Sequence, residues 1–501
     1  MAISSSGISF SGLASGIDSG KLIEQLVALE SIPIKQLEAK KAEYQAKLSA
    51  VGTLKGLVKE LQKKAEGLAT KADFLSFRTS VSQEGFVEAS ATGSATPGSH
   101  SVTVNALATI DRWTFDAVAD QTVDLATVDG QKISFTVDGT SYDVPVTAAE
   151  SSLEDIAAAV NSVAGEKVAA SVVNVGTSSS PSYQLVLTSK SSGQDNRISG
   201  ITNTIAGLTI DATGPNGLGV AQSANNISVG NNAEAVIDGL TVTRETNEFT
   251  DVVTGLSLTL QAADPATTLS ISVEADTGAI KSKVKEFVET FNKLVDFVNA
   301  QNSYNQDTGP GGKLFGDPIL RDVLGQVRAA LFNVPTSVVQ ADTEGYSTLQ
   351  LVGIKTQSDG KLQIDSAILD DKLEENLELF ADLFIDSDGF DNGGAAENTP
   401  AYYTDTTEDS GLADTLDRAI DKMLKTYTGP NGNTFKGLFD ARAQTYNDNV
   451  TRLLKDIDAK ELHVEKFHEG LVLKFAKLEE VMGGLQAQGA SLQAALSGLI
   501  G

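Results

Sequence analysis

The segment 446–499 decides the fold, and it reads YNDNVTRLLKDIDAKELHVEKFHEGLVLKFAKLEEVMGGLQAQGASLQAALSGL. An apolar residue stands at every seventh position of this segment. The row consists of Val450, Ile457, Val464, Leu471, Leu478, Leu485, Leu492 and Leu499. A second row interleaves with it, namely Tyr446, Leu453 and Phe467, then after a shift of one residue Phe475, Met482 and Leu496. A seven-residue apolar repeat is typical of a helix that packs against another helix. The sequence therefore predicts a long helix over 446–499 that serves assembly.

The N-terminal end carries a matching pattern. Its apolar residues follow alternating spacings of three and four, at Val51, Leu54, Val58, Leu61, Ala65 and Leu68. Further stripes precede this row, one at Leu37, Tyr44 and Leu48 and a shorter one at Leu22, Leu26 and Leu29. Ser31-Ile32-Pro33 separates the stripes because proline interrupts a helix, so helices are predicted at 19–30 and 34–70. Two interpretations remain open. Either the two ends bury each other completely within one chain, or they leave apolar surface for neighbouring subunits.

Composition limits the class of function. The chain has 501 residues, enough for several domains, and a net charge of −28, which disfavours binding to nucleic acid or to an anionic membrane. It has no cysteine, so disulfides, zinc–cysteine sites and thiol catalysis are excluded. No stretch of eighteen apolar residues is present, so we expect no membrane insertion.

The middle of the chain changes character at about residue 76. Val, Ile, Thr and Ser alternate there with Asp-Gly and Gly-Asn turns, which is typical of antiparallel strands and hairpins. One short helix is predicted at 152–163, with Ser152 as N-cap. The expected fold class is α+β and multidomain, with helical coiled-coil legs, a mixed helical domain and two β-rich head domains in nested insertion. The predicted domains are 1–45 with 455–501, 46–76 with 276–454, 77–120 with 233–275, and the insert 121–232.

Catalytic and cofactor signatures are weak. The three histidines do not form a metal-ligand pattern. The acidic stretch 386–411 fails the EF-hand pattern because Asp391 occupies the glycine position. The glycine-rich stretch 309–313 lacks the Ser or Thr of a phosphate loop. Trp113 and Phe115 could stack on a sugar but fit the core of a sheet better. We therefore expect no enzyme activity, no metal and no cofactor.

Six short motifs occur in order along the chain. They are Gly12-Leu13-Ala14-Ser15-Gly16-Ile17-Asp18, the segment 233–260 with Ile237-Asp238-Gly239 and Thr243-Arg244, Leu314-Phe315-Gly316-Asp317, Gly353-Ile354 with Asp359-Gly360-Lys361-Leu362, Gly411-Leu412-Ala413-Asp414, and Lys474-Phe475-Ala476-Lys477-Leu478. Together they resemble the family of flagellar filament cap proteins, also called hook-associated protein 2. The departures are the long acidic loop at 386–411 and His468-Glu469-Gly470-Leu471, where a more polar run with an arginine is expected.

The resemblance implies a secreted structural protein of the bacterial flagellum, located at the filament tip and exported through the type III apparatus. Such a protein promotes flagellin polymerisation and prevents loss of subunits. The implied partners are flagellin, the hook–filament junction proteins, an export chaperone, and further copies of the chain in a ring, as a pentamer.

We expect the contacts with flagellin or a neighbouring subunit at Leu22, Leu26, Leu29, Leu478, Leu485, Leu492 and Leu499. An alternative function is a surface adhesin that binds glycans through the β-rich head domains, because their surface is rich in Ser, Thr and Asn. A secreted hydrolase is the weakest alternative, because aromatic residues make up only 6% of the chain.

Overall fold

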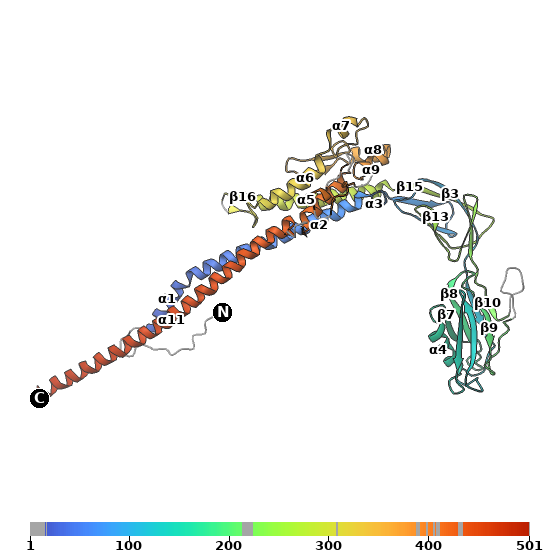
Figure 1. Ribbon diagram of the computed structural model, residues 1–501, viewed down its shortest axis with the longest axis horizontal. Helices are drawn as coiled ribbons and strands as arrows, with labels where there is room; N and C mark the ends of the chain where they lie inside the picture. Colours follow the sequence, from blue (N-terminus) through green and yellow to red (C-terminus); the bar gives the residue numbers. More distant parts are fainter. Residues whose placement is uncertain are drawn as a thin grey trace. The chain divides into compact units, whose positions relative to one another are not determined.

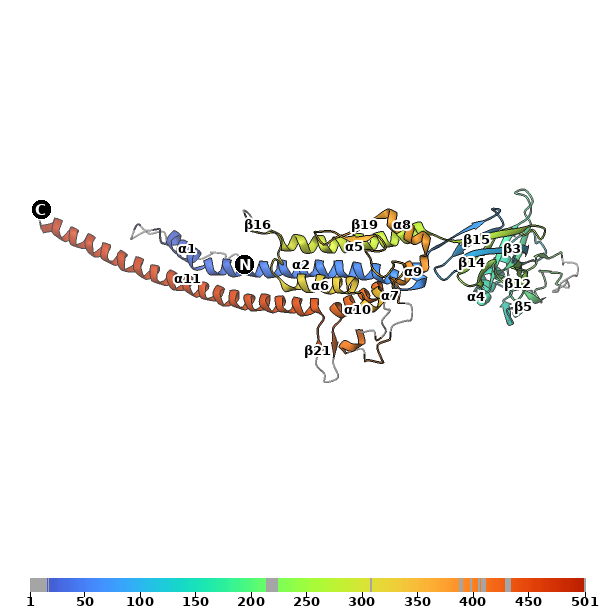
Figure 2. The same ribbon diagram turned by 90° about the horizontal axis from the view of Figure 1, so that it is seen from above.

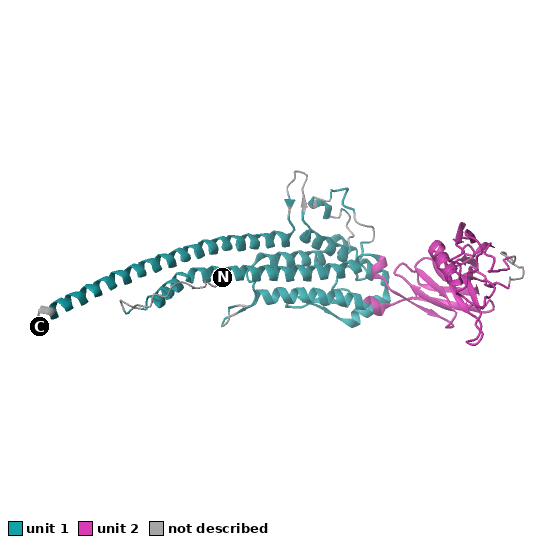
Figure 3. Cartoon of the chain, turned by 90° about the horizontal axis from the view of Figure 1, so that it is seen from below, with its two compact units in different colours: residues 1–70, 281–501 teal, residues 71–280 magenta. Residues whose placement is uncertain are grey.

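The structure is a computed structural model. It describes residues 16, 18–212, 224–306, 309–386, 391–396, 399–403, 406, 411–428 and 434–499. The chain divides into two compact units, one of residues 1–70 with 281–501 and one of residues 71–280 (Figure 3). Helices dominate the first unit and antiparallel sheets the second. The predicted α+β fold class is confirmed.

The first unit is built mainly from helices (Figures 1 and 2). They are α1 (Ser19–Glu30), α2 (Ile32–Ala69), the part of α5 (Thr277–Asn302) from residue 281 on, α6 (Pro318–Phe332), α7 (Thr336–Ala341), α8 (Ser366–Glu375), α9 (Leu377–Asp382), a 3-10 turn (Pro400–Tyr403), α10 (Leu412–Leu424) and α11 (Leu438–Leu499). Among the described residues, three two-stranded hairpins join these helices, namely β16–β17 (Tyr304–Asn305, Gly309–Pro310), β18–β19 (Ile354–Thr356, Leu362–Ile364) and β20–β21 (Tyr427–Thr428, Thr434–Phe435).

The core of the first unit forms around α2. The predicted row of Val51, Leu54, Val58, Leu61, Ala65 and Leu68 is fully buried, and α2 packs against α10 and α11. Each buried leucine side chain stabilises the fold by about 1.5–3 kcal/mol. On its outer side α2 is joined to α5 by the ion pairs Lys64–Glu286 (2.6 Å) and Lys293–Glu60 (3.2 Å). The apolar face of α5 within this unit is also buried, from Val284 to Val298.

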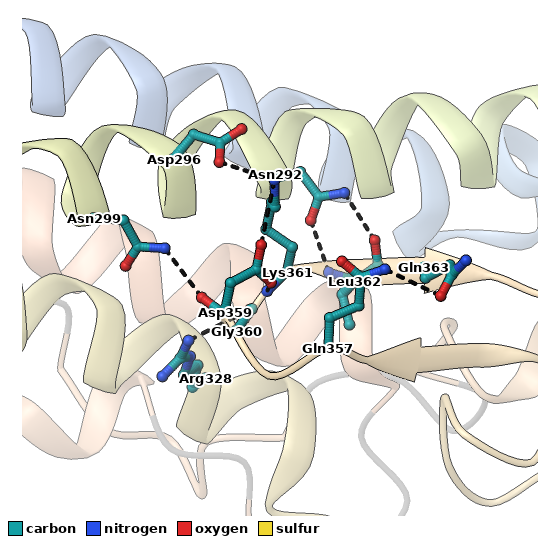
Figure 4. Close-up of polar contacts among 10 residues, drawn as sticks. All are labelled: Asn292, Asp296, Asn299, Arg328, Gln357, Asp359, Gly360, Lys361, Leu362 and Gln363. Atoms are coloured by element: carbon teal, nitrogen blue, oxygen red, sulfur yellow. Dashed lines mark hydrogen bonds and ion pairs between the residues drawn. The ribbon is translucent and has the colours of Figure 1, made fainter.

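The motif residues 353–365 fasten the β18–β19 hairpin to this core (Figure 4). Asn292 of α5 exchanges two hydrogen bonds with the backbone of Leu362, at 2.7 and 2.8 Å. Lys361 forms ion pairs with Asp296 of α5 and with Asp359, at 3.2 and 3.3 Å. Gly360 has φ +84° and lies so close to Arg328 of α6 that a Cβ atom would collide with its guanidinium group. These motif residues therefore hold secondary structure together.

Asp317 has a similar role at the start of α6. Its carboxylate caps α6 by accepting a hydrogen bond from the backbone N–H of Ile319 at 3.1 Å. It also binds Arg442 of α11, with an N–O distance of 2.7 Å, and accepts a hydrogen bond from the hydroxyl of Tyr446. The Asp317 side chain is buried, where an unpaired charge would be strongly unfavourable, and Arg442 neutralises this charge. The Leu314–Asp317 motif thus joins α6 to the base of α11.

One carboxylate between α10 and α2 works against stability. Asp417 of α10 accepts a hydrogen bond from Nε2 of Gln62 at 2.9 Å. Burial raises the pKa of Asp417, and the neighbouring charge of Asp421 raises it further. The folded chain therefore holds this proton more tightly than the unfolded chain. Ionised Asp417 destabilises the fold above its raised pKa, and the cost vanishes as the pH falls below its ordinary value of 3.8.

We expect Asp417→Asn to raise the urea midpoint of the first unit at pH 7, because the amide removes the buried charge and keeps an acceptor for Gln62. The gain should shrink as the pH is lowered towards 4. Asp440→Asn is the matched control of opposite sign, since the hydrogen bond from Lys55 lowers the pKa of Asp440. That variant should lose stability at pH 7. Equal stabilities of parent and Asp417→Asn at pH 7 would contradict the assignment.

The second unit begins with the short helix α3 (Lys71–Phe74) and includes the first turn of α5 (Figure 1). Its described residues form four sheets. Two of them share one core: a five-stranded sheet in the order β1-β15-β3-β11-β12 and a three-stranded sheet in the order β13-β14-β2. Their strands are β1 (Phe77–Val81), β2 (Val87–Ala91), β3 (Gly98–Ala106), β11 (Ala233–Ile237), β12 (Leu240–Arg244), β13 (Glu248–Val253), β14 (Leu256–Leu260) and β15 (Thr268–Ala275).

The other two sheets share a second core with the helix α4 (Leu153–Ala164). Their orders are β10-β4-β8-β7 and β6-β5-β9. The strands are β4 (Ile110–Thr114), β5 (Gln131–Val137), β6 (Thr140–Val146), β7 (Val168–Asn174), β8 (Tyr183–Ser192), β9 (Ser199–Asn203) and β10 (Asn226–Ser228). The N-cap predicted at Ser152 is present, and it forms a capping box in which the Ser152 and Asp155 side chains bond to each other's backbone.

The insert begins earlier than predicted. Strand β4 at 110–114 pairs with β8 and β10, and Trp113 and Phe115 are buried in the core of the insert. The boundary placed between residues 120 and 121 is therefore too late. Strand pairing is non-local, and the local sequence of β4 does not reveal which sheet it joins.

Asp111 of β4 is a buried carboxylate with only 2% of its surface exposed. Its two oxygens accept four hydrogen bonds, from Nε1 of Trp113 (2.8 Å), the backbone N–H of Ile198 (2.9 Å), the amide of Asn226 (3.1 Å) and the backbone N–H of Gly230 (3.0 Å). These donors come from β4, from the loop before β9, and from β10 and the loop after it. The N–H dipoles balance the charge of Asp111, and the four hydrogen bonds join three segments of the insert.

Candidate interaction surface of the terminal helices

The break between α1 and α2 falls where the sequence predicts it. Asp18 caps α1 by accepting a hydrogen bond from the backbone N–H of Lys21 at 3.1 Å. The helix ends at Glu30, and α2 begins at Ile32 with Pro33 in its first turn. Backbone N–H groups of the first turn have no acceptor within the helix, so the missing N–H of proline costs no hydrogen bond there. The change of direction allows α1 to contact α11 as well as α2. His463 of α11 lies 3.4 Å from a carboxylate oxygen of Glu30.

α11 is one helix of 62 residues and begins eight residues before the expected start at 446. Its first heptad row changes from buried to exposed along the helix. Val464 is 2% exposed, whereas Leu478, Leu485 and Leu492 are 43%, 57% and 65% exposed. In both ribbon views no described element lies beside the last part of α11 (Figures 1 and 2). The same heptad row is therefore part of the core in the first part of α11 and part of the surface in the last part.

α1 presents apolar residues on two faces. Ile23 is buried and Leu26 is half-buried, whereas Leu22 and Leu29 are exposed. The predicted row of Leu22, Leu26 and Leu29 thus lies mainly on the outer face, and the inward contact of Ile23 was missed. The adjacent positions of Leu22 and Ile23 made either residue a candidate for the inner face. Only the position of α11 decides between them.

The exposed leucines together with the half-buried Leu26 form the candidate interaction surface, which we define as Leu22, Leu26, Leu29, Leu478, Leu485 and Leu492. The side chain of Leu499, the seventh predicted contact, lies outside the described residues, as do Gly12–Ser15 and Ile17 of the first motif. Burying a leucine side chain contributes about 1.5–3 kcal/mol. A partner helix that covered several of these side chains would therefore gain substantial binding energy, before the costs of association.

Catalytic chemistry finds little support in the described part of the chain. No group of three His, Cys, Asp or Glu side chains there could hold a metal ion. Trp113 and Phe115, considered above as a sugar platform, are buried. Asp386, at the start of the acidic stretch 386–411, is bound by Arg418 at 3.1 Å, and much of that stretch lies outside the described residues. Within the described residues no helix has the length and apolar character needed to cross a membrane.

Comparison with known proteins gives consistent matches over most of the chain. The family model described as the C-terminus of flagellar hook-associated protein 2 matches residues 230–487, and the model of its N-terminus matches residues 15–111. An A-type flagellar hook-associated protein 2 from Pseudomonas aeruginosa is 28% identical, over 98% of this chain and 97% of that protein. A flagellar hook-associated protein 2 from Escherichia coli K12 is 26% identical, over 89% and 94%.

The fold is similar to a solved structure of the same kind. The crystal structure of the D1-D2-D3 domains of the flagellar cap protein FliD from Escherichia coli matches with a TM-score of 0.59. The match covers 79% of this chain and 99% of the FliD chain, at 23% sequence identity. At this identity the match shows a common fold.

Proposed function

We propose, from the premise that this chain belongs to the flagellar hook-associated protein 2 family, that it caps the tip of the flagellar filament and promotes polymerisation of flagellin beneath it. The family consists of structural proteins of the flagellar cap and is not an enzyme family. A role in the flagellum, in contact with filament components and in an oligomer, follows from this membership. The tip location, the effect on polymerisation and the partners are the proposal.

The observation that carries the proposal is the exposed end of α11. Leu478, Leu485 and Leu492 are exposed to water and therefore add no burial energy to the fold of a monomer. Large exposed apolar patches mark contact surfaces. We infer that this end packs against flagellin or against a neighbouring copy. Gly483, Gly484 and Gly489 lie in the same stretch, and each weakens a helix by about 1 kcal/mol relative to alanine. A leg that bends there could follow a filament whose symmetry differs from that of the cap.

The remaining partners follow from the same surface and from the family. An export chaperone that covers the apolar end of α11 would keep it from aggregating before type III export. The hook–filament junction proteins would bind the cap before the first flagellin subunits are added. We propose a ring of copies, as a pentamer. Mass measurement of the purified ring tests this number.

The experiment that tests capping is deletion of the gene in the source organism, with filaments and spent medium examined together. We expect short or absent filaments and unpolymerised flagellin in the medium. Added purified protein should restore filament growth. Normal filaments after deletion would overturn the cap function and would favour the adhesin alternative, which a glycan array with the full chain would then test.

A further inference from the structure

A cleft of about 640 Å³ lies in the first unit between α5, α6 and the turn of the β18–β19 hairpin. One face of α6 lines it with Arg321, Leu324, Gly325, Arg328 and Phe332. These five residues fall within a sector of about 100° at 3.6 residues per turn. The row that packs into the core, including Val323 and Val327, lies on the other side of the helix. The cleft face of α6 is therefore a second apolar face that also carries two positive charges.

The two arginines of this face have little to neutralise them. Arg328 donates a weak hydrogen bond to the carbonyl oxygen of Gly360 at 3.4 Å (Figure 4), and no carboxylate in the described part of the chain forms an ion pair with it. Arg321 is 84% exposed and contacts Asp322 at 3.6 Å. In a chain of net charge −28, these two weakly paired guanidinium groups suit an acidic partner.

Gly325 stands in the middle of α6, where glycine costs about 0.5–1 kcal/mol relative to alanine. A Cβ atom at this position would meet nothing within 4 Å, so packing within the described chain does not require glycine. Absence of a side chain on an exposed helix face allows another backbone to approach closely. Gly325 is thus a second sign that a helix docks here, independent of the charges.

The middle of α11 carries a face of the opposite character, which we call the acidic face. It consists of Asp458, Glu461, Glu465 and Glu469, bordered by the exposed Leu454 and Leu462, and it also spans about 100° of the helix. Three glutamates follow one another at i,i+4, where like charges destabilise a helix by about 0.2–0.5 kcal/mol per pair. None of the four carboxylates has an ion pair within the described chain. A cationic partner would relieve this repulsion.

We propose that the cleft of α6 binds the acidic face of α11 from a second copy of this chain. The spacings agree: Arg321 and Arg328 are seven residues apart, as are Asp458 and Glu465, which is about 10 Å along each helix. Leu462 lies between the two acidic residues and would enter the cleft beside Leu324. The close approach at Gly325 would bring the two helices into contact.

The contact joins two copies, because one chain cannot make it within itself. In a single chain α6 meets α11 at Arg442 and Tyr446, and Leu462 lies roughly 24 Å further along the straight helix. The paired copies are therefore displaced along the helix axis or run in opposite directions. This interface goes beyond the proposed cap role, and it leaves the leucines at the end of α11 free for the filament.

Two charge-reversal variants of the full chain test the interface. One carries Arg321→Glu and Arg328→Glu, and the other carries Asp458→Arg and Glu465→Arg. By sedimentation at low salt we expect each variant alone to self-associate at least tenfold more weakly than the parent. An equimolar mixture should recover association, because every cleft then faces an opposite charge. Parent-like association of both variants, or no recovery in the mixture, would overturn the proposal.

Cysteine pairing provides the second measurement, because the chain has no cysteine of its own. A Leu324→Cys variant is mixed with a Leu462→Cys variant and oxidised, and we expect a cross-linked product of twice the chain mass. The control replaces the second partner by Leu240→Cys, an exposed leucine of β12. Equal yields for the two mixtures would contradict the proposed contact. Both tests use purified protein, so they are independent of the filament phenotype that tests capping.

Discussion

A chain carrying Leu485→Asp and Leu492→Asp is expected to fold like the parent but to fail as a cap. Cells that express it should lack filaments and release flagellin into the medium. Both side chains are more than half exposed, so the described chain loses little packing. The two charges would instead be placed in the surface that we propose for flagellin or a neighbouring copy, where burying an unpaired charge is strongly unfavourable. Electron microscopy of filaments and assay of secreted flagellin in a complemented deletion strain give the result.

The control for this variant places the same charges on the opposite side of the helix. Ala487→Asp and Ala494→Asp are also exposed and seven residues apart, and they are rotated by about half a turn from the leucines. Both double variants lower helix propensity by a similar amount. Filaments of normal length with the leucine variant, or equal loss with the alanine variant, would show that this apolar row is not the functional surface.

Asp111→Ala is expected to be the most damaging single substitution in the insert, at about 3–5 kcal/mol of unfolding free energy. Removal of the carboxylate leaves four buried N–H donors without their acceptor, and they belong to three segments of the chain. Asp111→Asn should also destabilise, since one oxygen that accepts hydrogen bonds becomes an NH₂ group that faces other donors.

The measurement for Asp111 uses a natural probe. Trp113 is the one tryptophan of the chain, and its indole N–H is bonded to Asp111. The midpoint of its fluorescence change in urea therefore reports unfolding of the insert specifically. The control is Asp251→Ala, which removes an exposed partner of Arg244 and should leave the midpoint nearly unchanged. A midpoint of Asp111→Ala close to that of the control would refute the structural role.

Local patterns in the sequence predicted much of the helical part. The heptad rows gave α11, the spacing from Val51 to Leu68 gave the buried face of α2, and Pro33 gave the break after α1. Each of these signals is local, because helix periodicity and caps depend on neighbours within a few residues. The exposed positions of Leu485 and Leu492 agree with the second of the two interpretations, in which the terminal helices bury each other only in part.

Features that depend on distant contacts were harder to predict. The local sequence of 110–114 does not indicate that this segment pairs with β8 and β10. The buried role of Asp111 requires three segments to meet, and an acidic residue in a strand ordinarily suggests an exposed face. Likewise the cleft face of α6 becomes visible only when the β18–β19 hairpin is placed against α5.

The pairing of α2 with α11 also sets a limit on the order of folding. Lys55 and Asp440 form an ion pair at 2.6 Å across 385 positions of sequence. The apolar row of α2 thus has no complete cover until the last eighth of the chain is available, whereas the strands of 71–280 find their partners within that span. Contacts of such long range form slowly. A chain that emerges N-terminus first would complete its sheets early and its helical unit only at the end, so a truncation before residue 438 would leave α2 exposed.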